Sequence, residues 1–175
     1  MKRTGLICIN TGNGKGKTTA AIGTAIRAAG QGLKVLILQF MKGQKDVGEL
    51  NALSKTDLPI TIRQYGRKGF IRNKADRTID CELARAGLKD FGEAVASGRF
   101  DLIILDEINM AIDFDLLLLD DVMAAIEQKT PELHLILTGR NARKELIEIA
   151  DLVTEMKEIK HPYRKGIMAQ KGIEF

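Results

Sequence analysis

Hydrophobic positions along the chain fall into short, uninterrupted runs that are separated by longer segments. The runs are rich in Ile, Leu and Val, and they lie at residues 6–9, 35–38, 60–62, 102–105, 133–137 and 152–153. Continuous rather than alternating apolar runs are typical of strands that are covered on both faces. Helical segments between them predict right-handed crossovers, and therefore an α/β fold with a mostly parallel central sheet and helices on both faces.

Two of the intervening segments have the features of helices. Residues 18–29 are rich in Ala, which favours a helix packed closely on the sheet. Residues 74–97 form the longest predicted helix, with Asn73 as its N-cap and Gly98 just beyond its end. Its apolar stripe is made of Ile79, Leu83, Ala84, Leu88, Phe91 and Val95. No repeat or linker divides the chain, so residues 1–175 are predicted to form one nucleotide-binding domain.

Composition narrows the class of protein. The chain has 45% hydrophobic and 29% charged residues, as globular proteins do. No apolar run approaches the ~20 residues of a membrane span. The apolar stretch that follows the basic residues 1–3 is too short for the core of a signal peptide, so a cytoplasmic location is expected. Cys8 and Cys81 lack the spacing of a disulfide framework or a zinc cage. The net charge of +4 is compatible with nucleotides, nucleic acid or neither.

A glycine-rich loop follows the first predicted strand and leads into the Ala-rich helix. Its glycines let successive backbone N–H groups point at an anion, and the helix N-terminus adds its positive end. Lys17 is expected to reach phosphate oxygens and Thr18 to ligate Mg²⁺. The usual pattern has a glycine where Thr11 stands, so the loop is a variant. The predicted nucleotide contacts are Gly12, Asn13, Gly14, Lys15, Gly16, Lys17, Thr18 and Thr19.

Two further strands deliver polar residues to the same edge of the predicted sheet. The run at 102–105 ends in Asp106 and Glu107, and a hard Mg²⁺ ion prefers such oxygens, so either carboxylate can complete a metal site with Thr18. The run at 133–137 ends near Thr138 and Arg140, which fit a site role and a turn or capping role equally well.

The chain shows no arrangement for nucleophilic catalysis by a side chain. It has no GxSxG motif, and neither His134 nor His161 has the spacing of a triad or a metal ligand, so structural roles are favoured for both. An enzyme of this kind relies on charge neutralisation and positioning.

Several segments in order along the chain resemble the bacterial ATP:corrinoid adenosyltransferases. They are residues 10–21, 39–43, 105–107, 137–140, 150–156, 160–163 and the closing 169–175. The resemblance implies a RecA-like phosphate-loop fold. It also implies transfer of the 5′-deoxyadenosyl group of ATP to the cobalt(I) of a reduced corrinoid, which forms adenosylcobalamin or adenosylcobinamide and releases triphosphate.

The implied chemistry fits the residues of the loop. Cobalt(I) is itself a nucleophile that carries no proton, so attack at C5′ needs no general base. Lys15 and Lys17, with Mg²⁺ or Mn²⁺, would stabilise the triphosphate leaving group. Family members share a threonine at the Thr11 position and hold ATP with its triphosphate reversed, so that C5′ faces the corrinoid.

The resemblance also implies roles for individual residues. Thr18 and Glu107 are the expected metal ligands, with Asp106 as second choice. Phe70 would crowd the lower face of the corrinoid and help remove its axial ligand, and packing of Phe70 on the core is the alternative. Arg72 stands where the family often has Trp. Longer members have a helical N-terminal extension over the site, so here the cover is expected to come from elsewhere.

Partners are predicted from charge and from the resemblance. A basic cluster could meet the anionic tail of the corrinoid or an acidic reductase such as a flavodoxin, although a solvated basic surface explains it as well. The cluster consists of Arg63, Arg67, Lys68, Arg72, Lys74 and Arg77. The resemblance suggests a homodimer, in which residues 114–119 either form an interface or cover the core. No nucleic acid or membrane partner is expected.

Two other classes of function stay open at this point. A RecA-like ATPase acting on nucleic acid is possible because a Glu directly after the Asp, as at Glu107, can orient an attacking water. A non-enzymatic module that senses ATP is the other. A zinc-bearing nucleoside kinase would need cysteine pairs that the chain lacks.

Overall fold

Six strands form one parallel sheet in the computed structural model, which describes residues 3–44, 46–67 and 74–174. The strands are β1 (Ile7–Thr11), β2 (Val35–Phe40), β3 (Ile60–Tyr65), β4 (Leu102–Asp106), β5 (His134–Thr138) and β6 (Leu152–Glu155). Their order across the sheet is β3-β2-β4-β5-β1-β6, and every neighbouring pair is parallel. The six apolar runs coincide with these strands, which confirms the predicted α/β class.

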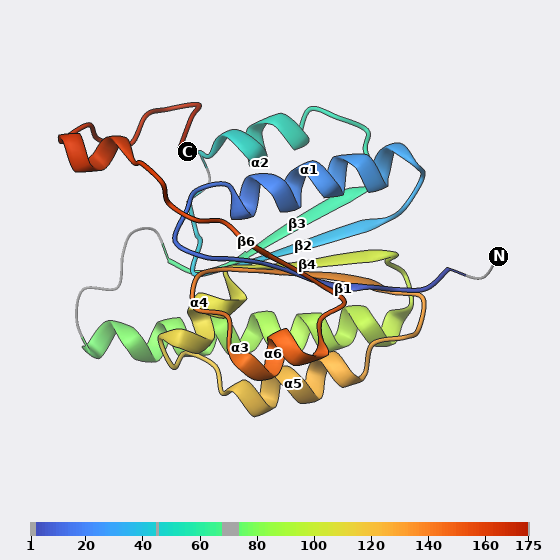
Figure 1. Ribbon diagram of the computed structural model, residues 1–175. Helices are drawn as coiled ribbons and strands as arrows, with labels where there is room; N and C mark the ends of the chain where they lie inside the picture. The colour runs from blue at the N-terminus through green and yellow to red at the C-terminus, as the bar shows by residue number, and fades with distance from the viewer. Residues whose placement is uncertain (1–2, 45, 68–73, 175) are drawn as a thin grey trace.

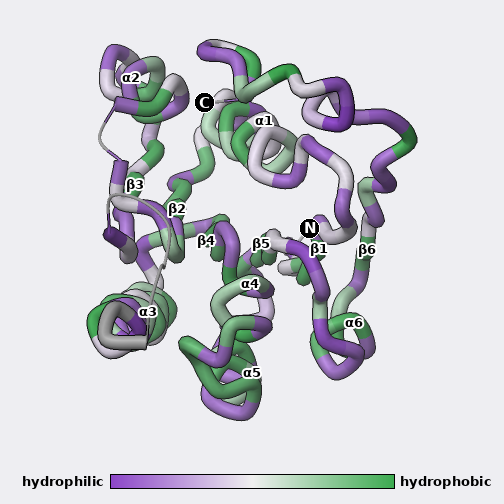
Figure 2. Tube along the Cα trace, turned by 90° about the vertical axis from the view of Figure 1, so that its left-hand side faces the viewer, coloured by the Kyte–Doolittle hydropathy of each residue, from purple (hydrophilic) through white to green (hydrophobic). Residues whose placement is uncertain are grey.

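Helices cover both faces of the sheet (Figures 1 and 2). The helices α1 (Lys17–Gly30) and α2 (Gly48–Leu53) lie on one face. The opposite face carries α3 (Lys74–Ser97), α4 (Ile108–Asp113), α5 (Leu119–Glu127) and α6 (Lys144–Ile149). A 3-10 helix, η1 (Pro162–Lys165), lies near the C-terminus. The helices α2, α4, α5 and α6 were not predicted, because helices of six to nine residues have too few turns to show a period.

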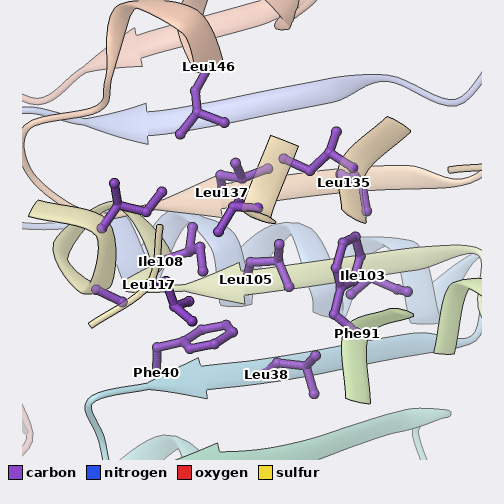
Figure 3. Close-up of a cluster of buried hydrophobic side chains, with 14 of the residues drawn as sticks. Leu38, Phe40, Phe91, Ile103, Leu105, Ile108, Leu117, Leu135, Leu137 and Leu146 are labelled. Atoms are coloured by element: carbon purple, nitrogen blue, oxygen red, sulfur yellow. The ribbon is translucent and has the colours of Figure 1, made fainter. Parts of the chain in front are cut away.

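Two hydrophobic cores separate the sheet from its helices. On the α1 face, Ala21, Ala25 and Ala29 lie four residues apart and pack on Ile37 and Ile104, so the small side chains let the helix approach closely. The larger core lies on the other face, where Figure 3 shows Phe40, Phe91, Leu105 and Leu137 among its members. The central strands are buried on both faces, which is why they are uninterrupted apolar runs in the sequence.

Helix α3 has the predicted bounds, and one end of its predicted stripe is wrong. Ala84, Phe91 and Val95 are buried as expected, but Ile79 is 46% exposed. Asp80 faces inward instead and forms an ion pair with Arg67 at 2.7 Å. The sequence did not show that Asp80 takes the inward position in place of Ile79. A carboxylate is buried in this position only because Arg67, from another part of the chain, pairs with it. The predicted N-cap, Asn73, lies outside the described residues.

Two glycines within α3 provide a matched stability test. A Cβ at Gly87 would lie 2.8 Å from ring atoms of Phe40 and Tyr65, whereas a Cβ at Gly92 would meet nothing within 4 Å. We expect Gly87→Ala to lower the free energy of unfolding by about 1–3 kcal/mol through overpacking. Gly92→Ala should raise it by about 0.5–1 kcal/mol through helix propensity. Urea unfolding of both variants checks this, and equal effects would contradict the packing described for α3.

The topology brings four strand ends to one place. Because all strands are parallel, the carboxyl ends of β1, β2, β4 and β5 lie at the same edge of the sheet, beside the N-terminus of α1 (Figure 1). The C-terminal segment passes over this edge as well. In the described part of the chain, no helix combines the length and apolar character needed to cross a membrane.

Candidate active site

The glycine-rich loop between β1 and α1 is held against the segment that follows β6. The Gly14 N–H donates to the Met156 carbonyl at 2.6 Å, and the Met156 N–H donates to the Thr11 carbonyl at 2.8 Å. Gly12 has φ +92°, and a Cβ there would lie 2.5 Å from the Met156 oxygen, so only glycine fits. The unusual Thr11 accepts a hydrogen bond from the Ala142 N–H at 3.3 Å, which ties the loop to the segment after β5.

Lys17 spans the inside of this loop. Its ammonium donates to the carbonyls of Gly12 at 2.8 Å and Gly14 at 2.7 Å. Burial lowers the pKa of Lys17, the Glu107 carboxylate opposes that shift, and the Arg140 guanidinium adds to it. The loop therefore holds a positive charge in the concave backbone where a phosphate is expected to bind.

Asp106 is the hub of the polar network at the sheet edge. Its side chain is 1% exposed. One carboxylate oxygen accepts hydrogen bonds from Thr18 Oγ1 at 2.8 Å and Thr138 Oγ1 at 2.7 Å. The other accepts from Lys42 Nζ at 2.7 Å and Gln39 Nε2 at 3.2 Å. Asp106 thus joins α1, β5, the end of β2 and the residues after it, which makes the network rigid.

Glu107 lies beside this network in a left-handed backbone conformation, with φ 63°. Its N–H donates to Thr138 Oγ1 at 2.9 Å. Burial and the adjacent Asp106 charge raise the pKa of Glu107, while Lys42 and Lys17 oppose the shift. Thr138 is fully buried between Asp106 and Glu107, and this contact favours the site role over the turn role for it.

A cleft of about 540 Å³ opens above these residues. Its walls are Lys15, Gly16, Lys17, Thr18, Thr19, Ile22, Lys42, Gly48, Glu49, Glu107, Gly172, Ile173 and Glu174. Lys15 Nζ donates to the Ile173 carbonyl, so the C-terminal segment forms one wall. Asn13 and Arg140 instead line a neighbouring cleft of about 630 Å³. Five of the eight predicted nucleotide contacts, residues 15–19, therefore line one cleft, and Asn13 lines the other.

The donor set fits a divalent cation of the Mg²⁺ type. Thr18 and Asp106 offer hard oxygens within 2.8 Å of each other, and Glu107 lines the same cleft. The Lys42 ammonium already sits on this pair, at 2.7 Å from Asp106 Oδ2 and 3.3 Å from Thr18 Oγ1. The oxygens of Asp106 and Thr18 thus already face a positive charge.

Two residues of the network, Gln39 and Lys42, were missed by the sequence analysis. Gln39 is fully buried, and its side chain contacts Asp106 and Gln64. Both residues lie at or just after the end of β2, so the available signal was their place on the carboxyl edge of a parallel strand. Residues 39–43 were noted for the family resemblance, without a role for either side chain.

Other predicted residues lie away from the cleft or are already paired. Arg63, Arg67 and Arg77 of the basic cluster form ion pairs with Asp90, Asp80 and Asp115, which neutralises their charge locally. Phe70, Lys68 and Arg72 lie outside the described residues.

Histidines, cysteines and the Leu-rich segment have structural surroundings. His134 Nδ1 accepts from the Leu6 N–H, and His161 Nδ1 accepts from the Tyr163 N–H, as structural roles would require. Cys8 and Cys81 are half-buried free thiols. Within residues 114–119, Leu116 and Leu117 cover the core, whereas Phe114 and Leu118 are exposed.

Comparison with known proteins decides the family. The family model described as "ATP:corrinoid adenosyltransferase BtuR/CobO/CobP" matches residues 3–175. The chain belongs to this family. As a member of it, the chain is a transferase that acts on corrinoids, which confirms this coarser part of the activity implied by the sequence resemblance.

Individual relatives match the adenosyltransferase chain over nearly its whole length. It is 40% identical to the corrinoid adenosyltransferase of Sinorhizobium sp, over 98% of this chain and 80% of that protein. It is 39% identical to the corrinoid adenosyltransferase of Pseudomonas aeruginosa, over 98% of this chain and 84% of that protein. With corrinoid adenosyltransferase CobA of Salmonella typhimurium the identity is 34%, over 98% and 86%.

Solved structures identify the fold of this adenosyltransferase. A KaiC-like protein from Pyrococcus horikoshii matches with a TM-score of 0.57 and 16% identity, over 90% of this chain and 75% of that one. The RadB recombinase matches with a TM-score of 0.53 and 14% identity, over 91% and 78%. These likenesses confirm the RecA-like phosphate-loop fold.

Proposed function

We propose that this enzyme transfers the 5′-deoxyadenosyl group of ATP to the cobalt(I) of a reduced corrinoid and releases triphosphate. The products would be adenosylcobalamin or adenosylcobinamide. The observation that carries the proposal is the cleft itself, because Lys15, Lys17 and Lys42 line it together with Gly16, Thr18 and Thr19 of the phosphate-binding loop. Three ammonium groups and the loop amides stabilise negative charge that builds on a triphosphate leaving group.

The described walls of the cleft hold no imidazole or thiol that would activate or act as a nucleophile. Among them there is no histidine and no cysteine. Attack by cobalt(I) on C5′ forms a cobalt–carbon bond and breaks the C5′–O5′ bond. The electron pair of that bond leaves with the triphosphate, and no proton is transferred, so positioning and charge neutralisation are sufficient.

A divalent cation completes the proposed site. Thr18 and Asp106 are the residues that would hold Mg²⁺ or Mn²⁺, because their oxygens already face each other. Glu107, the carboxylate favoured by the resemblance, lines the cleft beside them. The bound metal would neutralise charge on the triphosphate. The protein's contribution is to hold the oxygen donors next to Lys17 and the loop.

Finer features of the reaction remain part of this proposal. The resemblance implies that ATP binds with its triphosphate reversed, with C5′ toward the corrinoid. It also implies that Phe70 contacts the corrinoid, and that a flavodoxin-type reductase and a second copy of the chain take part. The cytoplasmic location stays a prediction as well.

A turnover assay tests the proposed function. Purified enzyme is incubated with Mg²⁺-ATP and chemically reduced cobalamin or cobinamide, and the product is identified by its light-sensitive cobalt–carbon absorption. We expect adenosylated corrinoid to form only when enzyme, ATP and reduced corrinoid are all present. Hydrolysis of ATP without such a product would favour the ATPase, and tight ATP binding without turnover would favour the sensing module.

A further inference from the structure

Lys42 is the cation that the network around Asp106 holds in this structure. Its ammonium lies 2.7 Å from Asp106 Oδ2 and 3.3 Å from Thr18 Oγ1, so it contacts both oxygen donors of the proposed metal site. Gln39 Nε2 donates to the same carboxylate oxygen at 3.2 Å. An ammonium and a divalent cation cannot share these oxygens, because two like charges a few ångströms apart repel.

The surroundings of Lys42 provide an alternative position for its charge. The side chain is 30% exposed and lines the 540 Å³ cleft together with Lys15 and Lys17. It follows the end of β2, and its ammonium already lies 3.3 Å from Thr18 Oγ1 at the end of the phosphate-binding loop, so a triphosphate bound in the cleft would be within its reach. Asp106, by contrast, is held in place by Thr18 and Thr138 and stays where it is.

We propose that Lys42 is an exchangeable cation, which fills the metal position in the nucleotide-free enzyme and moves onto the triphosphate when Mg²⁺-ATP binds. In the empty site its charge balances Asp106, which would otherwise be a buried and uncompensated carboxylate. In the loaded site its charge is added to that of Lys17 on the leaving group. The first part of the proposal, that Lys42 fills the metal position in the nucleotide-free enzyme, concerns the protein alone. The second part, that Lys42 moves onto the triphosphate, rests on the proposed function.

Binding of Mn²⁺ to the nucleotide-free enzyme tests the first part. Lys42→Met removes the competing ammonium, so we expect Mn²⁺ affinity, measured by electron paramagnetic resonance, to increase about tenfold. Lys15→Met removes the same charge from the same cleft, but its ammonium contacts Ile173 and not Asp106. It should therefore change Mn²⁺ affinity much less. Unchanged or weaker Mn²⁺ binding by folded Lys42→Met would overturn the exchange.

A second variant keeps this test decisive if Lys42→Met does not fold. Lys42→Gln retains an amide donor for Asp106 without the charge, and the same gain in Mn²⁺ affinity is expected. Adding Asp106→Asn to either variant should abolish the gain in Mn²⁺ affinity, because the Asp106 carboxylate is the group that loss of the Lys42 ammonium makes available to the metal. A gain that survives Asp106→Asn would show that Mn²⁺ binds elsewhere and would refute the proposal.

Binding of Mg²⁺-tripolyphosphate tests the second part without relying on turnover. Because Lys42→Met also frees the metal donors, the comparison is made in the Asp106→Asn background, where Lys42 no longer competes with the metal. If Lys42 moves onto the phosphates, adding Lys42→Met there should weaken binding of this probe about tenfold in calorimetry. Unchanged affinity would overturn the move. The assay of the unmodified enzyme for cobalt–carbon bond formation separates the two ideas, since its failure removes the proposed function and leaves both binding results intact.

Discussion

Lys17→Ala is expected to reduce kcat for adenosyl transfer by about 10²–10³-fold, the cost of losing a preorganised charge on a leaving group. In the structure the Lys17 ammonium is buried and held by two carbonyls of the loop, at 2.8 and 2.7 Å. The side chain is therefore already held inside the loop, where the proposed triphosphate leaving group would bind. Single-turnover kinetics with chemically reduced cobalamin measure the effect on the chemical step directly.

Lys89→Ala is the control for this prediction. Lys89 is 80% exposed on α3, where it pairs only with Glu93 of the same helix among the contacts that the structure describes. It should leave kcat unchanged. Near-normal transfer by Lys17→Ala, with ATP still bound, would refute the role assigned to the lysine.

Asp106→Asn should reduce transfer at limiting Mg²⁺ by about 100-fold, since even outer partners of a metal site contribute about 10–100-fold to metal affinity. The substitution keeps the size of the side chain and removes its charge. Asp106 directly contacts Thr18, whereas no contact of the Glu107 carboxylate with Thr18 is found among the described residues. We therefore expect Glu107→Gln to have the smaller effect on Mg²⁺ dependence.

Titration of Mg²⁺ at saturating ATP distinguishes the two carboxylates. Recovery of Asp106→Asn at high Mg²⁺ would support a role in metal binding. If Glu107→Gln instead causes the greater loss of Mg²⁺ affinity, the metal lies on the residue that the family resemblance favoured, and the hub around Asp106 has a structural role.

The sequence was sufficient to predict the sheet and the phosphate-binding loop, for physical reasons. Strands buried on both faces must be apolar throughout, and the Ala-rich face of α1 is needed for close packing on Ile37 and Ile104. Both signals are local. The glycines of the loop are local too, because Gly12 is required by its own backbone angle and by the nearby Met156 carbonyl.

The features that the sequence analysis did not predict depend on contacts between segments that are distant along the chain. Lys42 becomes part of the site only because β2 and β4 are neighbours in the sheet, which places it 2.7 Å from Asp106. Arg63 and Arg67 look like free cations in the sequence, but α3 supplies Asp90 and Asp80 as partners. No local pattern contains the partner of an ion pair, so these neutralised charges could not be foreseen.

The most direct test of the central claim is to follow the bridging oxygen of ATP during transfer. Enzyme, Mg²⁺, reduced cobalamin and ATP labelled with ¹⁸O at O5′ are combined, and the phosphorus products are analysed by NMR and mass spectrometry. Attack at C5′ predicts intact tripolyphosphate that carries the ¹⁸O, in equal amount with the adenosylated corrinoid. ADP and phosphate as the products, or ¹⁸O retained in the nucleoside, would contradict the account.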